Sequence, residues 1–275
     1  MTVESDTPHA SQRDAGPLEG VGVIVTRPAR QAAVFAQRIA ALGGSPLIWP
    51  AIVILPPQDH SQLAEVHARL EDYDIAIFVS ANAVEYGARA TPPWPAKLRT
   101  CAPGPGTAEA LAAAGIMDTR IPAKSWDSEG LLELADLNDV AGKRIVIFRG
   151  EGGREFLGNS LRVRGAIVDH IPCYRRVAPQ SGAEGLVEAM REGRANALTL
   201  TSAEGVDNLM TALGSEGRAR IATLPTFAAH PRIVERAREH GLLAVQTPGG
   251  DDGLLSGLLE WFAHGKSRVQ GGRNS

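Results

Sequence analysis

Short apolar runs alternate along the chain with segments of helical periodicity. Residues 145–148 are apolar and mostly β-branched, and in the segment that follows them Leu157 and Leu161 lie one helical turn apart. Two further apolar runs, at residues 23–25 and 75–79, are also followed by helical patterns. This alternation predicts an α/β protein with mainly parallel sheets and helices on both faces.

The pattern also repeats within the chain. Arg27 and Arg149 are 122 residues apart, and the same offset aligns the predicted strands beside them, and the helices that follow, without a gap. After a shift of register, SEGLLEL from Ser128 matches DDGLLSGLL from Asp251. Several matches in one order predict an internal duplication, and therefore two α/β lobes.

Two equivalent segments, IWPAIVILPP and HIPCYRRVAP, are apolar and bounded by prolines. Proline is poorly tolerated inside central strands, so we expect these segments to form a two-stranded linker between the lobes. Ligands of open α/β sheets bind beyond the carboxyl ends of the strands. Two facing lobes would therefore place four strand-end loops around one cleft.

These four loops carry polar side chains, at the positions where helices begin. The forked guanidinium of an arginine binds carboxylates, and Arg27, Arg30, Arg149 and Arg154 offer such forks in these loops. The first N–H groups of a helix also attract anions. Each hydroxyl alone is also explained as an ordinary N-cap, but the repetition in both halves favours a shared site. The predicted substrate-binding residues are Thr26, Arg27, Ser80, Ala81, Asn82, Arg149, Gly150, Gly152, Gly153, Thr201 and Ser202.

The glycine loop after residue 148 does not fit the nucleotide-binding motifs. The third glycine of a dinucleotide fingerprint would fall at Glu155, and the Gly-Lys-Ser/Thr of a P-loop is absent. Cys101 and Cys173 have no metal-ligand neighbours at a diagnostic spacing. We therefore expect no cofactor and no metal.

Composition narrows the class of protein further. The 275 residues are 44% hydrophobic and 21% charged, enough for one large or two small cores, and the net charge of −3 gives no general attraction to nucleic acid or anionic membranes. Residues 1–17 lack the apolar segment of a signal peptide, and no apolar run approaches the roughly 20 residues of a membrane span. We expect a cytoplasmic protein with a disordered leader at 1–17, a flexible tail at 265–275, and neither nucleic-acid nor membrane partners.

An ordered set of segments from about Val21 to Phe262 resembles uroporphyrinogen-III synthases. The set comprises VIVTRPARQAAVFAQRIAALGGSPLIWPAIVI, IFVSANAV, GPGTAEALAAAG, SEGLLEL, VIFRGEGGREFLGNSLRVRGAIVDHIPCYRR, TSAEGV and PRIVERAREHG. The resemblance implies two flavodoxin-like lobes with a cleft between them. The first would be discontinuous, residues 18–50 plus 178–264, and the second would be residues 51–177 including the linker strands.

The resemblance also implies an activity: a cofactor-free lyase that closes hydroxymethylbilane, a linear tetrapyrrole with carboxylate side arms, to uroporphyrinogen III. Water is lost and ring D, the last ring, is inverted, as a step of haem and other tetrapyrrole biosynthesis. A monomer is expected, with transient contact to the upstream bilane-forming enzyme. The alternative is a non-catalytic ligand-binding or regulatory module of the same fold.

Tyr174 is the candidate catalytic residue by resemblance. A tyrosine hydroxyl stays protonated at neutral pH and can donate a proton to a leaving hydroxyl. The repeat pairs Tyr174 with Ile52, which predicts an apolar residue at the equivalent place in the first half. The alternative is an amphipathic side chain on an exposed connecting strand.

Overall fold

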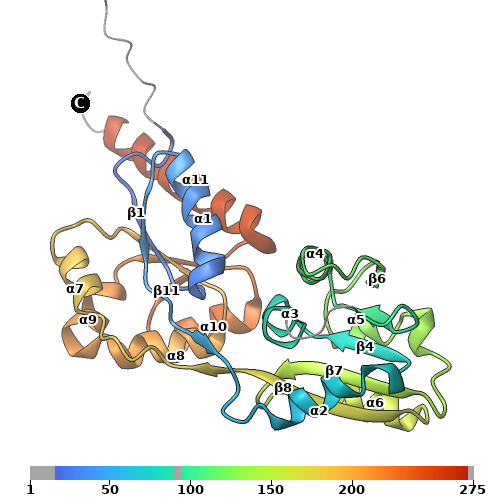
Figure 1. Cartoon of the computed structure of the whole chain (residues 1–275). Helices are drawn as coiled ribbons and strands as arrows, with labels where there is room; N and C mark the ends of the chain where they lie inside the picture. The colour runs from blue at the N-terminus through green and yellow to red at the C-terminus, as the bar shows by residue number, and fades with distance from the viewer. Residues whose placement is uncertain (1–15, 89–93, 272–275) are drawn as a thin grey trace, which may run out of the picture. The chain divides into compact units, whose positions relative to one another are not determined.

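The computed structural model describes residues 16–88 and 94–271 (Figure 1). The chain forms two compact units, one made of Met1–Val53 with Ala178–Ser275 and the other of Ile54–Val177. Each unit has its own sheet with helices packed on it, so the predicted fold class of two α/β lobes with parallel sheets is confirmed. The cleft between the lobes remains a prediction.

The first unit is built on a five-stranded sheet of order β11-β10-β9-β1-β2, in which the described pairs are parallel. This is the flavodoxin-like order, and its switch point lies between β1 and β9. Pro46 falls in the edge strand β2, where a missing N–H is tolerated. The strands are β1 (Gly22–Val25), β2 (Ser45–Ile48), β9 (Ala197–Leu200), β10 (Pro225–Ala228) and β11 (Leu243–Gln246).

Helices cover both faces of this sheet. Helices α1 and α11 pack on one face, and α7, α8, α9 and α10 pack on the other (Figure 1). Because side chains alternate along a strand, Val23 and Val25 contact the first group while Ile24 contacts the second. The helices are α1 (Ala29–Ala41), α7 (Glu184–Arg191), α8 (Ala203–Ala212), α9 (Gly214–Ile221), α10 (Pro231–Glu239) and α11 (Gly250–Gly271).

The second unit is built on a six-stranded sheet of order β3-β8-β7-β4-β5-β6. The pairs from β8 to β6 are parallel, and β7 and β8 pair along most of their length up to an irregularity after Arg149. The strands are β3 (Val53–Leu55), β4 (Ile75–Phe78), β5 (Arg99–Cys101), β6 (Thr119–Arg120), β7 (Arg144–Gly150) and β8 (Ile167–Val177).

The helices of the second unit also divide between two faces. Helices α2, α3 and α4 share a core with Phe78 and Phe148, while α5 and α6 share one with Ile77 and Ile147. The helical segments are α2 (Ser61–Ala68), η1 (Leu70–Asp72), α3 (Ala81–Gly87), α4 (Pro105–Ala113), α5 (Ser128–Leu131), η2 (Ala135–Leu137) and α6 (Phe156–Val163).

The internal duplication is visible in the strand bounds. The offset of 122 residues between Arg27 and Arg149 also takes β1 to the start of β7, β2 to the start of β8, and β4 onto β9. Equivalent glycines, Gly43 and Gly165, end the first helix of each repeat, both with a φ of 86° that only glycine adopts easily. Apart from the additional edge strand β3, both sheets then have the same order, with β7, β8, β4, β5 and β6 in the places of β1, β2, β9, β10 and β11.

Neither repeat forms a lobe by itself, because each lobe contains strands of both repeats. The first sheet combines two strands of the first repeat with three of the second, and the second sheet combines two strands of the second repeat with four of the first, because β1 pairs with β9 and β7 pairs with β4. The two halves of the sequence therefore exchange strands, and both units depend on pairing between distant segments of the chain.

The ends of the predicted segments need adjustment. Ala51 belongs to the core of the first unit and its carbonyl accepts a hydrogen bond from Asn208, although we placed it in the second lobe. Helix α11 continues to Gly271, so the predicted tail from residue 265 begins within a helix. The predicted leader lies outside the described residues except for Gly16 and Pro17.

Gly130→Ala should destabilise the second unit, because a Cβ at this position would lie 1.9 Å from the carbonyl oxygen of Ser125. We expect a loss of about 2 kcal/mol or more in the free energy of unfolding, since a clash with backbone is not relieved by a rotamer change. Gly106→Ala is the matched control: its Cβ meets nothing within 4 Å, and alanine should stabilise α4 by about 0.5–1 kcal/mol. Urea denaturation measures both changes, and equal midpoints would contradict the close approach at Gly130.

Candidate functional site

The four predicted strand-end loops lie in two adjacent pairs. Strands β1 and β9 are neighbours in the first sheet, and strands β4 and β7 are neighbours in the second. Each pair flanks the switch point of its sheet, which is where open α/β sheets bind ligands.

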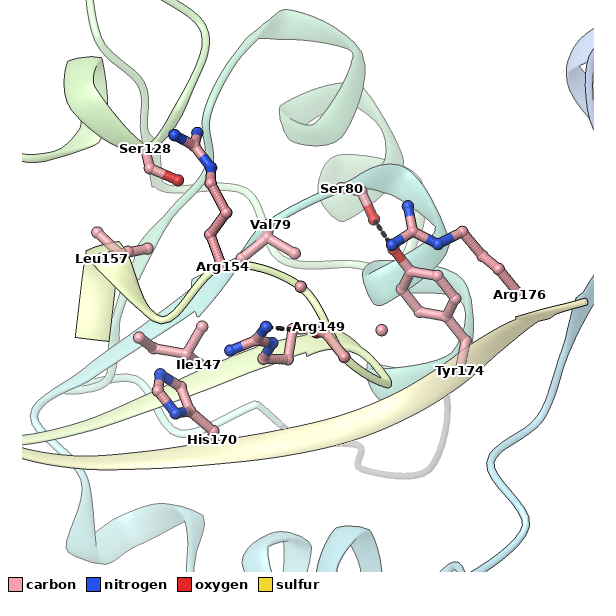
Figure 2. Close-up of a pocket in the computed structure, with 13 residues that line it drawn as sticks. Val79, Ser80, Ser128, Ile147, Arg149, Arg154, Leu157, His170, Tyr174 and Arg176 are labelled. Atoms are coloured by element: carbon pink, nitrogen blue, oxygen red, sulfur yellow. Dashed lines mark hydrogen bonds between the residues drawn. The ribbon is translucent and has the colours of Figure 1, made fainter. Parts of the chain in front are cut away.

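In the second unit, the loops after β4 and β7 line a hollow of about 400 Å³ (Figure 2). The lining comes from the end of β4, from β7 and the glycine loop after it, from β8, and from the first turns of α5 and α6. The predicted residues that line it are Ser80, Arg149, Gly150, Gly152, Gly153 and Tyr174. The other lining residues are Val79, Ser128, Ile147, Arg154, Leu157, His170 and Arg176.

The Tyr174 hydroxyl is held against the start of α3. Its oxygen lies 3.2 Å from Ser80 Oγ (Figure 2), and Ser80 Oγ accepts a hydrogen bond from the Ala83 N–H at 3.1 Å. The tyrosine is 5% exposed, and a Cβ on Gly150 would lie 2.8 Å from its ring. Glycine at position 150 is therefore what allows the ring to pack across the end of β7.

Arg149 is buried, and part of its fork is already in use. Its Nη1 donates to Glu155 Oε1 at 2.9 Å, and its Nη2 donates to the carbonyl oxygen of Gly152. Gly152 and Gly153 both have positive φ, which lets the backbone fold back over the guanidinium. We expected Arg149 to hold a ligand, and in this conformation it also shapes the loop.

Glu155 links this arginine to a histidine. Its second oxygen lies 3.1 Å from His170 Nδ1, and the nearby Gly158 leaves room for the ring, since a Cβ there would lie 2.2 Å from His170 Nε2. Burial lowers the pKa of His170, with Arg149 and Arg162 adding to the effect, while the Glu155 carboxylate opposes it. The net shift is downward, so the neutral imidazole is favoured.

The predicted residues of the first unit have structural partners of their own. The buried Thr26 hydroxyl donates to the carbonyl oxygen of Thr199 at 2.8 Å. Arg27 forms a 2.5 Å ion pair with Asp251, and its guanidinium lies 4.8 Å from the centre of the Phe35 ring. Ser202 caps α8, accepting from the Gly205 N–H at 2.9 Å.

The remaining predicted residues lie at helix starts. Thr201 is exposed directly before the cap of α8, and Ala81 and Asn82 are half-buried in the first turn of α3. They do not line the described hollow. Their assignment as substrate-binding residues stays a prediction.

Sequence reasoning did not assign His170, Arg176 or Ser128, although signals for them were present. His170 and Arg176 lie in the segment HIPCYRRVAP, which the repeat had marked and which contains Tyr174, although the irregularity between β7 and β8 after Arg149 interrupts the alternation of faces between His170 and Tyr174. Ser128 opens the SEGLLEL motif that the repeat had marked. Arg154, which we expect to offer a fork to carboxylates, forms a 3.0 Å ion pair with exposed Glu129.

Both cysteines are buried and unpaired with one another. Burial raises the pKa of each thiol to about 12, which suppresses the thiolate needed for metal binding or nucleophilic attack. Across residues 16–88 and 94–271, no group of three or more His, Cys, Asp or Glu side chains is arranged to hold a metal. In the same part of the chain, no helix has the length and apolarity to cross a bilayer.

Comparison with known proteins identifies the family. A family model described as uroporphyrinogen-III synthase HemD matches residues 33–250. The chain belongs to the uroporphyrinogen-III synthase family. The uroporphyrinogen-III synthase of Salmonella typhimurium is 35% identical over 247 residues, which span 86% of this chain and the whole of that enzyme. The Synechococcus elongatus enzyme is 31% identical, over 89% of this chain and 97% of its own.

Solved structures of the family share the fold. A uroporphyrinogen III synthase from Thermus thermophilus matches with a TM-score of 0.53 and 20% identity, covering 86% of this chain and 97% of its own. The Helicobacter pylori enzyme matches with a TM-score of 0.54 and 13% identity, covering 88% and 99%. At these identities the likeness concerns the arrangement of the chain alone.

His170 should make the stability of the protein depend on pH. Because the folded state lowers its pKa, the unfolded chain binds a proton that the folded chain does not, and the free energy of unfolding should fall as the pH drops through about 6.5. His170→Asn should reduce this fall between about pH 7.5 and pH 5.5. Urea midpoints across this range measure the slope, and a slope equal to that of the parent would exclude His170 as a contributor.

Proposed function

We propose that this chain closes hydroxymethylbilane to uroporphyrinogen III, with loss of water and inversion of ring D, in tetrapyrrole biosynthesis. The observation that carries the proposal is the match to the Salmonella typhimurium enzyme, which extends over that enzyme's full length. The family model and the relatives share one name, uroporphyrinogen-III synthase. The hollow in the second unit supplies groups suited to the reaction.

The main task of such an enzyme is to orient its substrate. The bilane loses its hydroxyl readily and also closes spontaneously to the I isomer, so catalysis must bring the substituted carbon of ring D to the reactive methylene. Holding two reacting atoms of one molecule in this geometry is an entropic effect that needs few catalytic side chains. Arginines and loop N–H groups around the hollow would hold the carboxylate side arms.

Tyr174 is proposed as the proton donor to the departing hydroxyl, which leaves as water. Ser80 Oγ uses one lone pair to accept the Ala83 N–H, and its own O–H remains able to donate to the tyrosine oxygen. In that arrangement the tyrosine proton points away from Ser80. The serine hydrogen bond then also stabilises the phenolate that forms when the proton has moved.

The protein would act as a cytoplasmic monomer, as a lyase without a cofactor, and would contact the upstream bilane-forming enzyme transiently to receive its labile substrate. The catalytically silent alternative is decided by the assay below.

The parental protein should convert hydroxymethylbilane to the III isomer in excess over the I isomer. Tyr174→Phe keeps the ring and its packing but removes the proton donor, so turnover should slow by up to about 10²-fold and the I isomer should accumulate from spontaneous closure. Isomer ratio and initial rate are measured at an unchanged melting temperature. Spontaneous isomer ratios with the parent would support the silent alternative, while parental rate and isomer purity in the variant would remove Tyr174 from the mechanism.

Ser80→Ala should combine a stability loss with a catalytic loss. Removing the cap should lower the free energy of unfolding by about 1 kcal/mol, and Ser202→Ala, which removes the equivalent cap of α8, gives the size expected from capping alone. The lost contact to Tyr174 should reduce kcat more than KM, and Ser80→Thr should restore it. In the Tyr174→Phe background Ser80→Ala should have no further effect on kcat, and additive losses would show that Ser80 acts by another route.

A further inference from the structure

The duplication provides, in the first unit, a second copy of the site. Arg27 and Arg149 are equivalent in the repeat. Arg27 follows β1 and Arg149 lies at the end of β7, and each of these strands flanks the switch point of its sheet. The helices that start near them, α11 and α5, are also equivalent. A comparison of the two copies therefore separates what the fold requires from what is particular to the hollow.

Three observations show that the starts of α5 and α11 occupy the same structural place. A Cβ on Gly130 would lie 1.9 Å from the Ser125 carbonyl oxygen, and a Cβ on Gly253 would lie 2.0 Å from that of Pro248, five residues earlier in both cases. The following residues, Leu131 and Leu254, are both about 1% exposed. Leu131 shares its core with α6, and Leu254 shares its core with α1, the helix equivalent to α6 in the repeat.

This alignment places Asp251 of the first unit on Ser128 of the second. In the first unit the Asp251 carboxylate stands 2.5 Å from Arg27, whose side chain is only 13% exposed. In the second unit Ser128 lines the hollow together with the buried Arg149. A carboxylate that the chain itself supplies in one copy is replaced by a small neutral side chain in the other.

The lining of the hollow is basic, and the carboxylates that pair with Arg149 and Arg154 lie outside it. The lining includes Arg149, Arg154 and Arg176 and, within the part of the chain that the structure describes, no Asp or Glu. Glu155 provides the counter-charge for Arg149 from outside the lining, and its repeat equivalent is Ala33. A buried guanidinium requires such a partner, and Glu155, whose side chain is 55% exposed, is placed to exchange with water or with another carboxylate.

We infer that the space beside Ser128 is a subsite for one carboxylate of the ligand. The bound carboxylate takes the position that is equivalent to that of the Asp251 carboxylate in the first unit. The carboxylate reaches the Arg149 side of the hollow, and Glu155 turns toward solvent when it binds. Because the assigned ligand is a side arm of the tetrapyrrole, this inference rests on the proposed function. Binding of a simple carboxylate tests the subsite without turnover.

Ser128→Asp should fill the subsite from within. An acidic residue in the first turn of a helix is compatible with the fold, so stability should be kept. KM for hydroxymethylbilane should rise on the order of tenfold or more while kcat changes little, since an internal carboxylate now competes with a side arm. Ser128→Asn adds similar bulk without charge and should raise KM less. Gln62→Glu, exposed on α2, is the charge-matched control and should keep the parental KM.

Binding of propionate is the measurement that does not depend on catalysis. Carbon-13 labelled propionate should bind the parent and Gln62→Glu saturably and should lose this binding in Ser128→Asp. In the first unit, Asp251→Ser should lower the melting temperature, and propionate should restore it more than chloride at equal ionic strength. These outcomes would support a carboxylate subsite whose design the two copies share.

The outcomes separate the two proposals. Lost propionate binding in Ser128→Asp, with no formation of the III isomer by the parent, would keep the subsite and reject the enzyme function. Formation of the III isomer by the parent, with parental KM and propionate binding in Ser128→Asp, would keep the function and overturn the subsite. Absence of saturable propionate binding in the parent, together with a parental KM in Ser128→Asp, would also overturn it.

Discussion

Both lobes depend on strand pairing between the two repeats. β1 pairs with β9, and β7 pairs with β4. The two strands that flank each switch point therefore come from segments that are far apart in the chain. This constraint places the loop after β4 beside the loop after β7. The Ser80 and Tyr174 hydroxyls, 94 residues apart in sequence, are in contact for this reason.

The same pairing explains why glycines surround the hollow. Two strand ends, a tyrosine ring and a buried guanidinium share a small volume, so Gly150 must lack a side chain where the ring crosses it and Gly153 where Arg149 reaches back. Gly150 and Gly153 permit close approach, and Gly152 and Gly153 adopt the left-handed φ that glycine tolerates. The loop is rich in glycine, as nucleotide-binding motifs are, because in both cases the backbone must approach another group closely.

Periodicity and the repeat were sufficient to predict the elements, the two parallel sheets and the loops at the strand ends. They did not determine that the halves exchange strands, because a buried strand such as β1 is apolar on both faces and carries no mark of its neighbour. They also did not determine the partners of Arg149. Glu155 and the Gly152 carbonyl meet it only through the conformation of the loop, and the irregularity in β8 interrupts the alternation of faces that would have related His170 to Tyr174.

The two copies of the site differ in the carboxylate that pairs with the equivalent arginines, Arg27 and Arg149. In the first unit Asp251, from the start of α11, neutralises Arg27, and the ion pair is a fixed part of the fold. In the second unit the counter-charge comes from Glu155, which is more exposed and also contacts His170, while Ser128 leaves the position of the aspartate open. A fixed internal carboxylate stabilises a lobe at the expense of ligand affinity, whereas an exchangeable one lets the same arginine serve both folding and binding. Duplication therefore allowed one lobe to keep the ion pair for stability and the other to open it for a ligand.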